Sequence, residues 1–164
     1  MLHTYISLGS NQGDTLENLE LAKSYIFCMK GIYPEQSSNI YYTEPQGVKD
    51  QSWFANQVIR VLFEPFWTAE SLLKGLLRIE DQMGRIRTKR FGPRIIDLDI
   101  LFFGNQELQT RDLVLPHPRM HQRAFVLIPL LELDKELALP NGQKLNSFLE
   151  NLNFWVRGDK IWQD

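Results

Sequence analysis

The sequence predicts an α+β fold of the ferredoxin-like type, a βαββαβ sandwich that is followed by extra C-terminal helices and short strands. Two observations predict it. The first six expected elements follow the order strand, helix, strand, strand, helix, strand. At 164 residues, with 43% hydrophobic and 23% charged residues, the chain is also long enough to bury one full core. We therefore expect a single domain over residues 1–164.

The N-terminal part supplies the first strand and helix. Every second residue from 2 to 8 falls on one face, which carries Leu2, Thr4, Ile6 and Leu8, and this alternation predicts a strand. Asp14, with Glu17 three residues later, predicts a helix N-terminus with a capping box. Apolar residues then recur at helical spacing, and the helix should end near Gly31. The second strand is expected at residues 38–43.

The middle of the chain continues the alternation. Residues 44–52 contain Pro and Gly and are expected to form a loop. Residues 54–63 are rich in β-branched and aromatic side chains, which favours a third strand. Thr68 can cap a second helix over residues 69–83. Its apolar positions are expected to be buried: Leu72, Leu73, Leu76, Leu77 and Ile79.

The remaining elements complete the sandwich and extend it. Residues 84–94 form a basic loop, and residues 95–103 an apolar central strand. The expected C-terminal additions are a short strand at 107–108, helices at 121–131 and 145–152, and a hairpin-like segment through Trp155 and Trp162.

Composition argues against several classes of partner. The net charge of −2 provides no global basic field, so we expect no nucleic-acid partner. The single cysteine, Cys28, cannot form an internal disulfide and fits a reducing compartment. No apolar stretch approaches the ~20 residues of a transmembrane helix, and the N-terminus has no basic leader. We expect a cytoplasmic monomer that acts on small molecules and binds no membrane.

Two carboxylates lie two residues apart inside the expected central strand. Side chains alternate faces along a strand, so Asp97 and Asp99 should point the same way, roughly 7 Å apart. Such a pair repels itself unless a cation lies between the two groups. Mg²⁺ fits, because it combines one or two carboxylates with substrate phosphates and water. Two such ions, ~4 Å apart, could share the pair.

A dense basic cluster comes just before these acids. It consists of Arg85, Arg87, Lys89, Arg90 and Arg94. Arginine suits bidentate contact with phosphate, and the flanking Gly84 and Gly92-Pro93 allow the loop to close over a ligand. The chain has no Walker A sequence, so arginine and metal should hold the phosphates. Acids and arginines together predict a polyphosphate site.

Other residues leave alternatives open. His117 and His121 stand four apart, but Pro116 and Pro118 disfavour a helix there, so we do not expect zinc. His117 either donates a hydrogen bond to a phosphate or fills a turn.

The aromatics Phe54 and Phe125 could be core residues. However, Asn56 follows Phe54 on the same strand face, and an aromatic ring beside an amide suits a flat heterocycle.

With these motifs the chain resembles the 6-hydroxymethyl-7,8-dihydropterin pyrophosphokinase family of folate biosynthesis. The resemblance covers about residues 2–132, and the segment Gly92-Pro93-Arg94-Ile95-Ile96-Asp97-Leu98-Asp99-Ile100 is its most specific part. Further matching segments are Tyr5-Ile6-Ser7-Leu8-Gly9-Ser10-Asn11, Tyr42-Thr43-Glu44-Pro45, Phe54-Ala55-Asn56, Gly84-Arg85-Ile86-Arg87, Leu115-Pro116-His117-Pro118-Arg119-Met120 and Arg123-Ala124-Phe125.

The resemblance implies transfer of the β,γ-pyrophosphoryl group of ATP, the co-substrate, to the pterin hydroxymethyl oxygen, with release of AMP. It implies that Asp97 and Asp99 hold two Mg²⁺ ions and that Arg85 and Arg94 stabilise the phosphates. No separate general base stands out, and Asp97 is the nearest candidate. Further nucleotide contacts are implied at Glu80, Arg87, Arg90, Ile100, His117 and Arg123, and pterin contacts at Thr43, Gln46, Phe54, Asn56 and Phe125.

A non-enzymatic alternative is a ferredoxin-like module that binds a nucleotide or RNA through the arginine loop. Asp97 and Asp99 argue against it, because a surface that faces RNA gains nothing from adjacent acids.

Overall fold

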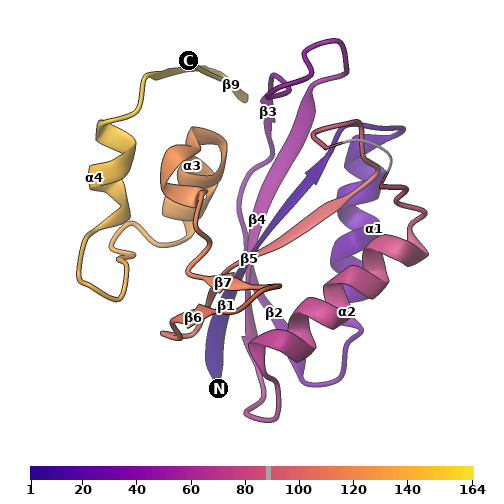
Figure 1. Cartoon of the computed structure of the whole chain (residues 1–164), viewed down its shortest axis with the longest axis vertical. Coiled ribbons are helices and arrows are strands. Elements are labelled where there is room, and N and C mark those ends of the chain that lie inside the picture. The colour runs from indigo at the N-terminus through magenta and orange to yellow at the C-terminus, as the bar shows by residue number, and fades with distance from the viewer. Residues whose placement is uncertain (88–89) are drawn as a thin grey trace.

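The protein is described by a computed structural model over residues 1–87 and 90–164 (Figure 1). Its elements in chain order are β1 Leu2–Ser10, α1 Thr15–Phe27, β2 Ile32–Ser37, β3 Tyr41–Thr43, β4 Phe54–Phe63, α2 Ala69–Gln82, β5 Asp97–Phe103, β6 Leu108–Gln109, β7 Val114–Leu115, a 3₁₀ turn at Met120–Gln122, α3 Ala124–Leu133, α4 Leu145–Glu150, β8 Phe154–Arg157 and β9 Lys160–Gln163.

One main sheet runs through the molecule in the order β5-β1-β4-β3-β9-β8, with β2 also paired to β4. β1 lies between β4 and β5 and is antiparallel to both. Helices α1 and α2 cover one face of the sheet, and α3 and α4 lie on the other side (Figure 1). The predicted ferredoxin-like α+β sandwich is therefore confirmed. The short β6–β7 pair forms a separate ribbon.

The second strand differs from the prediction at 38–43. It is divided into β2 and β3, which both pair antiparallel with β4. Between them the Ser38 hydroxyl accepts the Val58 N–H at 3.0 Å, while the Ser38 N–H donates to the Val58 carbonyl. β2 was missed because only Ile32 in it is buried, and Pro34 breaks its pattern. Proline is tolerated there because β2 is at the edge of the sheet.

Both main helices begin as expected. Asp14 accepts the Glu17 N–H at 3.1 Å, but the return contact from Glu17 that would complete the predicted capping box is not recorded among the described residues. The reciprocal contacts of a capping box are found instead at Thr68 and Ser71. Helix α1 buries Leu19, Ala22 and Ile26, and α2 buries Leu72, Leu76 and Ile79. The prediction that Leu73 and Leu77 are buried was wrong, since Leu73 is only partly covered and Leu77 is 37% exposed.

The C-terminal third departs from the prediction in its bounds and in one added strand, since β7 at Val114–Leu115 was not expected. The helix expected at 121–131 begins at Ala124, because the chain first makes the 3₁₀ turn. The hairpin expected through Trp155 and Trp162 is confirmed as β8–β9, in which these two residues are paired. β9 also pairs in parallel with β3 and so extends the main sheet.

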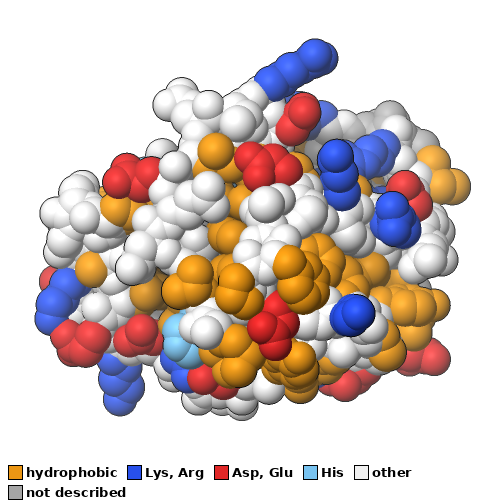
Figure 2. Space-filling model, turned by 90° about the horizontal axis from the view of Figure 1, so that it is seen from below, with side chains coloured by type: hydrophobic (Ala, Val, Ile, Leu, Met, Phe, Trp, Pro, Cys, Tyr) orange, Lys and Arg blue, Asp and Glu red, His pale blue; other side chains and the backbone are white. Residues whose placement is uncertain are grey.

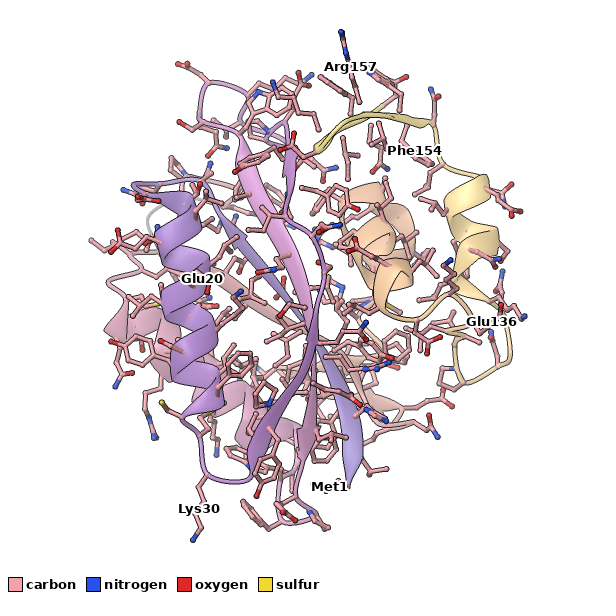
Figure 3. The ribbon with its side chains drawn as sticks, turned by 180° about the vertical axis from the view of Figure 1, so that it is seen from behind. Met1, Glu20, Lys30, Glu136, Phe154 and Arg157 are labelled. Carbon is pink, nitrogen blue, oxygen red and sulfur yellow. The ribbon has the colours of Figure 1, made fainter. Side chains whose placement is uncertain are left out.

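The sheet is sandwiched between two apolar clusters. One joins it to α1 and α2 and contains the stacked rings of Phe63 and Phe103, 4.2 Å apart. The other joins it to α3 and α4. Side chains fill the space on both sides of the sheet (Figure 3). None of the helices in the described part of the chain has the length and apolar character needed to cross a bilayer.

Two leucines of α1 test this packing. Leu19 is fully buried, so Leu19→Ala should lower the free energy of unfolding by about 3 kcal/mol through lost contacts and a cavity. Leu21 is 42% exposed, and Leu21→Ala should lower it by less than about 1 kcal/mol. Urea unfolding followed by circular dichroism measures both. Equal losses would contradict the assigned helix orientation.

Candidate active site

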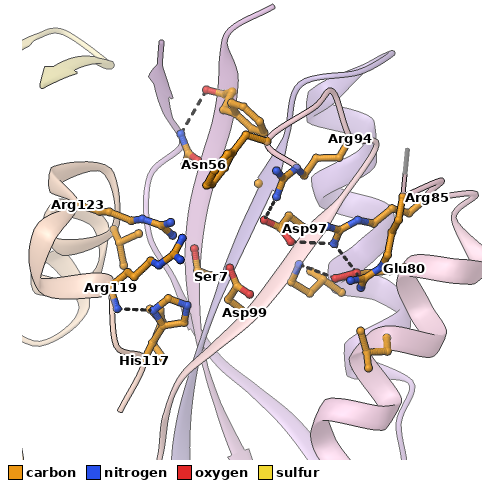
Figure 4. A pocket seen from close by; sticks show the side chains of 18 of the residues that line it. Ser7, Asn56, Glu80, Arg85, Arg94, Asp97, Asp99, His117, Arg119 and Arg123 are labelled. Atoms are coloured by element: carbon orange, nitrogen blue, oxygen red, sulfur yellow. Dashed lines mark hydrogen bonds and ion pairs between the residues drawn. The ribbon is translucent and has the colours of Figure 1, made fainter. Parts of the chain in front are cut away.

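An open cleft with a volume of about 1310 Å³ lies over one face of the sheet and past its β5 edge. Its floor is formed by β1, β4 and β5, and its walls by α2, residues 90–94 and the start of α3 (Figure 4). In the described part of the chain, seven Lys or Arg residues line this cleft together with six acidic residues. Charges of both signs are also scattered over the lower face of the molecule (Figure 2). A volume of this size is sufficient for two substrates together.

The fold brings nearly all predicted site residues to this cleft. The residues that line it are Thr43, Gln46, Phe54, Asn56, Glu80, Arg85, Arg87, Arg90, Arg94, Asp97, Asp99, His117, Arg123 and Phe125. Ile100 is the exception, since its side chain is 2% exposed and lies in the cluster beneath α1 and α2. Lys89 of the basic cluster falls outside the described residues.

Asp97 lies between two arginines (Figure 4). Its Oδ1 accepts from Arg85 Nη1 at 2.8 Å, and its Oδ2 accepts from Arg94 Nη1 at 2.7 Å. Both oxygens are thus neutralised by charge-assisted hydrogen bonds. Arg85 is at the start of the basic loop and Arg94 is at its end. This one carboxylate therefore holds both ends of the loop.

Glu80, at the end of α2, is the second anchor of the arginines. Its side chain is only 3% exposed, and Oε2 accepts from Arg85 at 2.5 Å and from Arg87 at 3.2 Å. Oε1 accepts the backbone N–H of Leu98 in β5 at 3.2 Å. Burial raises the pKa of Glu80, and the charge of Arg85 opposes that rise. The carboxylate therefore connects α2, the basic loop and β5.

Asp99 follows Asp97 on the same face of β5, opposite Ser7 of β1. Burial, and next the charge of Asp97, raise the pKa of Asp99 to about 7, while Arg123 opposes the rise. No arginine is recorded in an ion pair with Asp99 in the described part of the chain. A carboxylate in this position is stabilised by an added cation, so the pair fits a divalent metal.

The protein alone does not complete a metal shell among the described residues. No group of three or more His, Cys, Asp or Glu side chains there could hold an ion. Two aspartates leave most coordination positions to other oxygens, the arrangement typical of Mg²⁺ shared with substrate phosphates and water.

His117 faces the aspartates from the other wall. Its Nδ1 accepts the Arg119 N–H at 3.1 Å, so the ring proton is on Nε2, which can donate to a ligand. Its backbone N–H donates to the Leu101 carbonyl of β5 at 2.9 Å. Burial, with the nearby charges of Arg123 and Arg119, lowers the pKa of His117 to about 4. His117 is therefore a neutral hydrogen-bond donor near neutral pH.

The far end of the cleft is aromatic. Phe54 and Phe125 both line it, with the guanidinium groups of Arg94 and Arg123 each 5.8 Å from the respective ring centre. Asn56, two residues after Phe54 on β4, uses Nδ2 to donate to Thr43 Oγ1 at 3.0 Å. Its recorded hydrogen bonds all use Nδ2, so Oδ1 can accept from a ligand.

Asn11 and Gln51 were not predicted, yet they connect the loops on both sides of the cleft. Asn11 Oδ1 accepts the Arg94 N–H at 2.8 Å, and its Nδ2 donates to Gln51 and to the Ser52 carbonyl. Gln51 in turn donates to the Phe91 carbonyl at 2.9 Å. The available signal was Asn11 directly after Gly9-Ser10, a polar residue at the end of a buried strand.

Sequence reasoning also missed apolar lining residues. Leu73 and Leu77 are four apart on α2 and face the cleft with Leu98 and Leu113. Helical spacing alone does not distinguish a leucine that faces a ligand from one that faces the core. These leucines make the end of the cleft beside Glu80 partly apolar.

Comparisons with known proteins show which family the chain is similar to. Residues 5–135 match the sequence model of a family described as 7,8-dihydro-6-hydroxymethylpterin-pyrophosphokinase (HPPK). A 2-amino-4-hydroxy-6-hydroxymethyldihydropteridine pyrophosphokinase of Haemophilus influenzae is 37% identical over 150 residues, covering 92% of each sequence. The protein of the same name from Bacillus subtilis is 39% identical over 135 residues, covering 81% of this chain and 78% of the relative.

Solved structures show the same fold. A crystal structure of HPPK-DHPS in complex with substrates has a TM-score of 0.68 at 15% identity, over 98% of this chain and 48% of that one. Wild-type Plasmodium falciparum HPPK-DHPS with pteroate has a TM-score of 0.69 at 14% identity, over 98% of this chain and 47% of that one. The chain thus spans about half the length of these solved proteins.

The neutral state of His117 can be tested by titration. The pKa of its imidazole should be about 4 in the folded protein against about 6.5 unfolded, so the ring resonances should not shift between pH 5.5 and 8. Because the unfolded state binds the extra proton between these values, stability should rise with pH from about 4 to about 6.5.

The variant His117→Gln should remove that part of the slope. NMR titration and urea unfolding across this pH range measure both effects. A His117 midpoint near pH 6.5 would contradict the assignment.

Proposed function

The chain belongs to the 7,8-dihydro-6-hydroxymethylpterin-pyrophosphokinase family, and from this premise we propose how its residues carry the reaction. The protein transfers pyrophosphate from ATP to 6-hydroxymethyl-7,8-dihydropterin in folate biosynthesis. The pterin hydroxymethyl oxygen bonds to the β-phosphorus of ATP and gives up its proton. The bond between the β-phosphorus and the oxygen that bridges it to the α-phosphorus breaks, AMP leaves with that oxygen, and the pterin becomes its diphosphate. The observation that best supports the residue roles below is the acidic pair of β5, set between an arginine cluster and an aromatic pocket.

We assign metal binding to Asp97 and Asp99. The enzyme uses ATP, and Mg²⁺ is the expected companion ion. Two ions are proposed, because two carboxylates alone leave room for both and the triphosphate supplies further oxygens. When bound, Mg²⁺ neutralises phosphate charge and polarises the bond under attack. The raised pKa of Asp99 supports this role, since a cation removes the repulsion from Asp97.

Arg85 and Arg94 are assigned to the phosphates. Both pair with Asp97, so their guanidinium groups point into the part of the cleft where the phosphates would lie. A metal ion bound at Asp97 would balance its charge and would leave the two guanidinium groups free to donate to phosphate oxygens. Arg85 keeps Glu80 as a second anchor, so it can turn without losing its position. Charge that develops on the transferring group is stabilised by such preorganised donors.

The nucleotide is placed along α2 and the start of α3. Leu73 and Leu77 offer apolar contact to the base, and Glu80 lies beside them. His117 can donate through Nε2 to a phosphate without adding charge. The remaining predicted nucleotide contacts, Arg87, Arg90 and Arg123, supply cations around the chain of phosphates, and the backbone near Ile100 stays a prediction.

The pterin is placed between Phe54 and Phe125. A flat ring can stack on both, while Asn56 Oδ1 accepts a hydrogen bond from its edge. Thr43 and Gln46 lie on the same side of the cleft. In this position the hydroxymethyl group points toward the aspartates. Asp97 is the nearest carboxylate to receive its proton.

We also propose the wider setting of the enzyme. A single domain over residues 1–164 is supported because β9, near the end of the chain, joins the same sheet as β1. A monomer is supported because one chain supplies acids, arginines and aromatic rings to one cleft. A cytoplasmic location is supported by the use of ATP and by Cys28, an exposed free thiol.

Incubation with ATP, Mg²⁺ and the hydroxymethyl-dihydropterin tests the reaction together with Asp97. The wild type should release AMP, and Asp97→Asn should lower the rate at least about 100-fold, because a metal ligand and the partner of two arginines are lost. The matched control is Asp81→Asn, an exposed acid on α2, which should stay within about twofold. Chromatography of the nucleotides measures both, and ADP in place of AMP would contradict pyrophosphate transfer.

The aromatic pocket is tested by removing one ring. Phe125→Leu should raise the KM for the pterin about tenfold, because one stacking face is lost, and change the KM for ATP by less than about twofold. Phe66→Leu is the control, since Phe66 is 62% exposed and does not line the cleft. Steady-state kinetics with each substrate varied measures the two constants. A larger effect on ATP than on the pterin would reverse the assignment.

A further inference from the structure

The last strand of the chain is attached to the wall of the cleft that carries Thr43. Along β3 and β9, Tyr42 lies opposite Lys160 and Thr43 opposite Ile161. The Tyr42 N–H also donates to the Asp159 carbonyl at 2.7 Å. Ile161 is 1% exposed, so it anchors the strand in the protein interior. β9 is therefore fixed relative to the residues that support Asn56.

The same strand reaches the opposite wall through one side chain. Gln163 Oε1 accepts the Ala124 N–H at 2.7 Å, and Gln163 Nε2 donates to the Gln122 carbonyl at 2.7 Å. The first N–H groups of a helix have no acceptor within the helix. The N-cap residue of α3, Arg123, makes no side-chain capping bond. Gln163 supplies that acceptor from 39 residues away.

The two hydrogen bonds of Gln163 hold the backbone on either side of Arg123, next to residues proposed to bind the substrates. Gln122 and Ala124 flank Arg123, and Phe125 follows directly. Arg123 and Phe125 both line the cleft, and the guanidinium lies 5.8 Å from the ring centre. A backbone held on both sides of Arg123 leaves both side chains with few alternative directions. Without these bonds the first turn of α3 would be free to fray.

We propose that Gln163 is a positioning residue for pyrophosphate transfer. By capping α3 it holds Arg123 toward the phosphates and Phe125 against the pterin, and through β9 it connects them to the Thr43 wall. The inference rests on the proposed roles of Arg123 and Phe125. Gln163 lies in the C-terminal hairpin, outside residues 5–135, the part of the chain that matches the family model.

The amide group is what makes Gln163 suitable. It provides one acceptor and one donor at the end of the same side chain, and the two backbone groups need one of each. Methionine has a similar length and shape but cannot make either bond. Gln163→Met therefore removes the contacts while keeping much of the volume.

The test compares Gln163→Met with Gln36→Met. Gln36 is exposed on β2, away from the cleft, and no hydrogen bond of its side chain is recorded within the described residues. Gln163→Met should lower kcat/KM for the pterin about fivefold to tenfold, the effect of one or two lost hydrogen bonds. The KM for both substrates should rise, and hydrogen exchange of the Ala124 amide should become faster. Gln36→Met should leave all three unchanged.

The outcomes separate this role from a purely structural one and from the reaction itself. Kinetics are measured well below the melting temperature of every variant. A lower melting temperature for Gln163→Met with unchanged kcat/KM would overturn the positioning role, as would unchanged Ala124 exchange. The wild type is assayed in the same series, and if it released no AMP the proposed function would fail instead.

Discussion

Four charged side chains meet where the end of α2 approaches the start of β5, and the cleft depends on their mutual neutralisation. The Glu80 carboxylate is only 3% exposed, the Asp97 carboxylate is 25% exposed at the floor of the cleft, and Arg85 bonds to both. A carboxylate left there without its partner would cost several kcal/mol. Arg94 completes the charge balance on the other oxygen of Asp97. The loop between the two arginines is thereby fixed at both ends.

The two ends of the cleft differ chemically because different layers of the fold reach them. α2 contributes Leu73 and Leu77 at one end, while β4 and α3 contribute Phe54 and Phe125 at the other. β5 passes between them and carries the acids, so in the proposed binding mode the charged part of the nucleotide and the reacting end of the heterocycle would meet at this strand. Along the cleft the lining is therefore apolar at α2, charged at β5, and aromatic at β4 and α3.

Prediction from sequence succeeded where a residue's role leaves a local pattern. Asp97 and Asp99 were recognisable because acids are rare inside an apolar strand, and the arginines because they are dense. β2 was missed because Ile32 is its only buried residue, so no alternation exists to be detected. Leu73 and Leu77 were assigned to the core because leucines that line a cleft and leucines that face the core recur at the same helical spacing. Gln163 leaves no signal at all, since its partners are 39 and 41 residues away.

The position of β5 at the outside of the main sheet has a consequence for solubility. An outermost strand offers unpaired backbone groups on which a strand of another molecule could add. Here Glu80 takes up the Leu98 N–H, and the His117 N–H occupies the Leu101 carbonyl. Glu80 and His117 thus also occupy backbone groups of β5 with which a strand of another molecule could pair. Loss of Glu80 would therefore carry a hazard of intermolecular β-pairing and aggregation, separate from any loss of turnover.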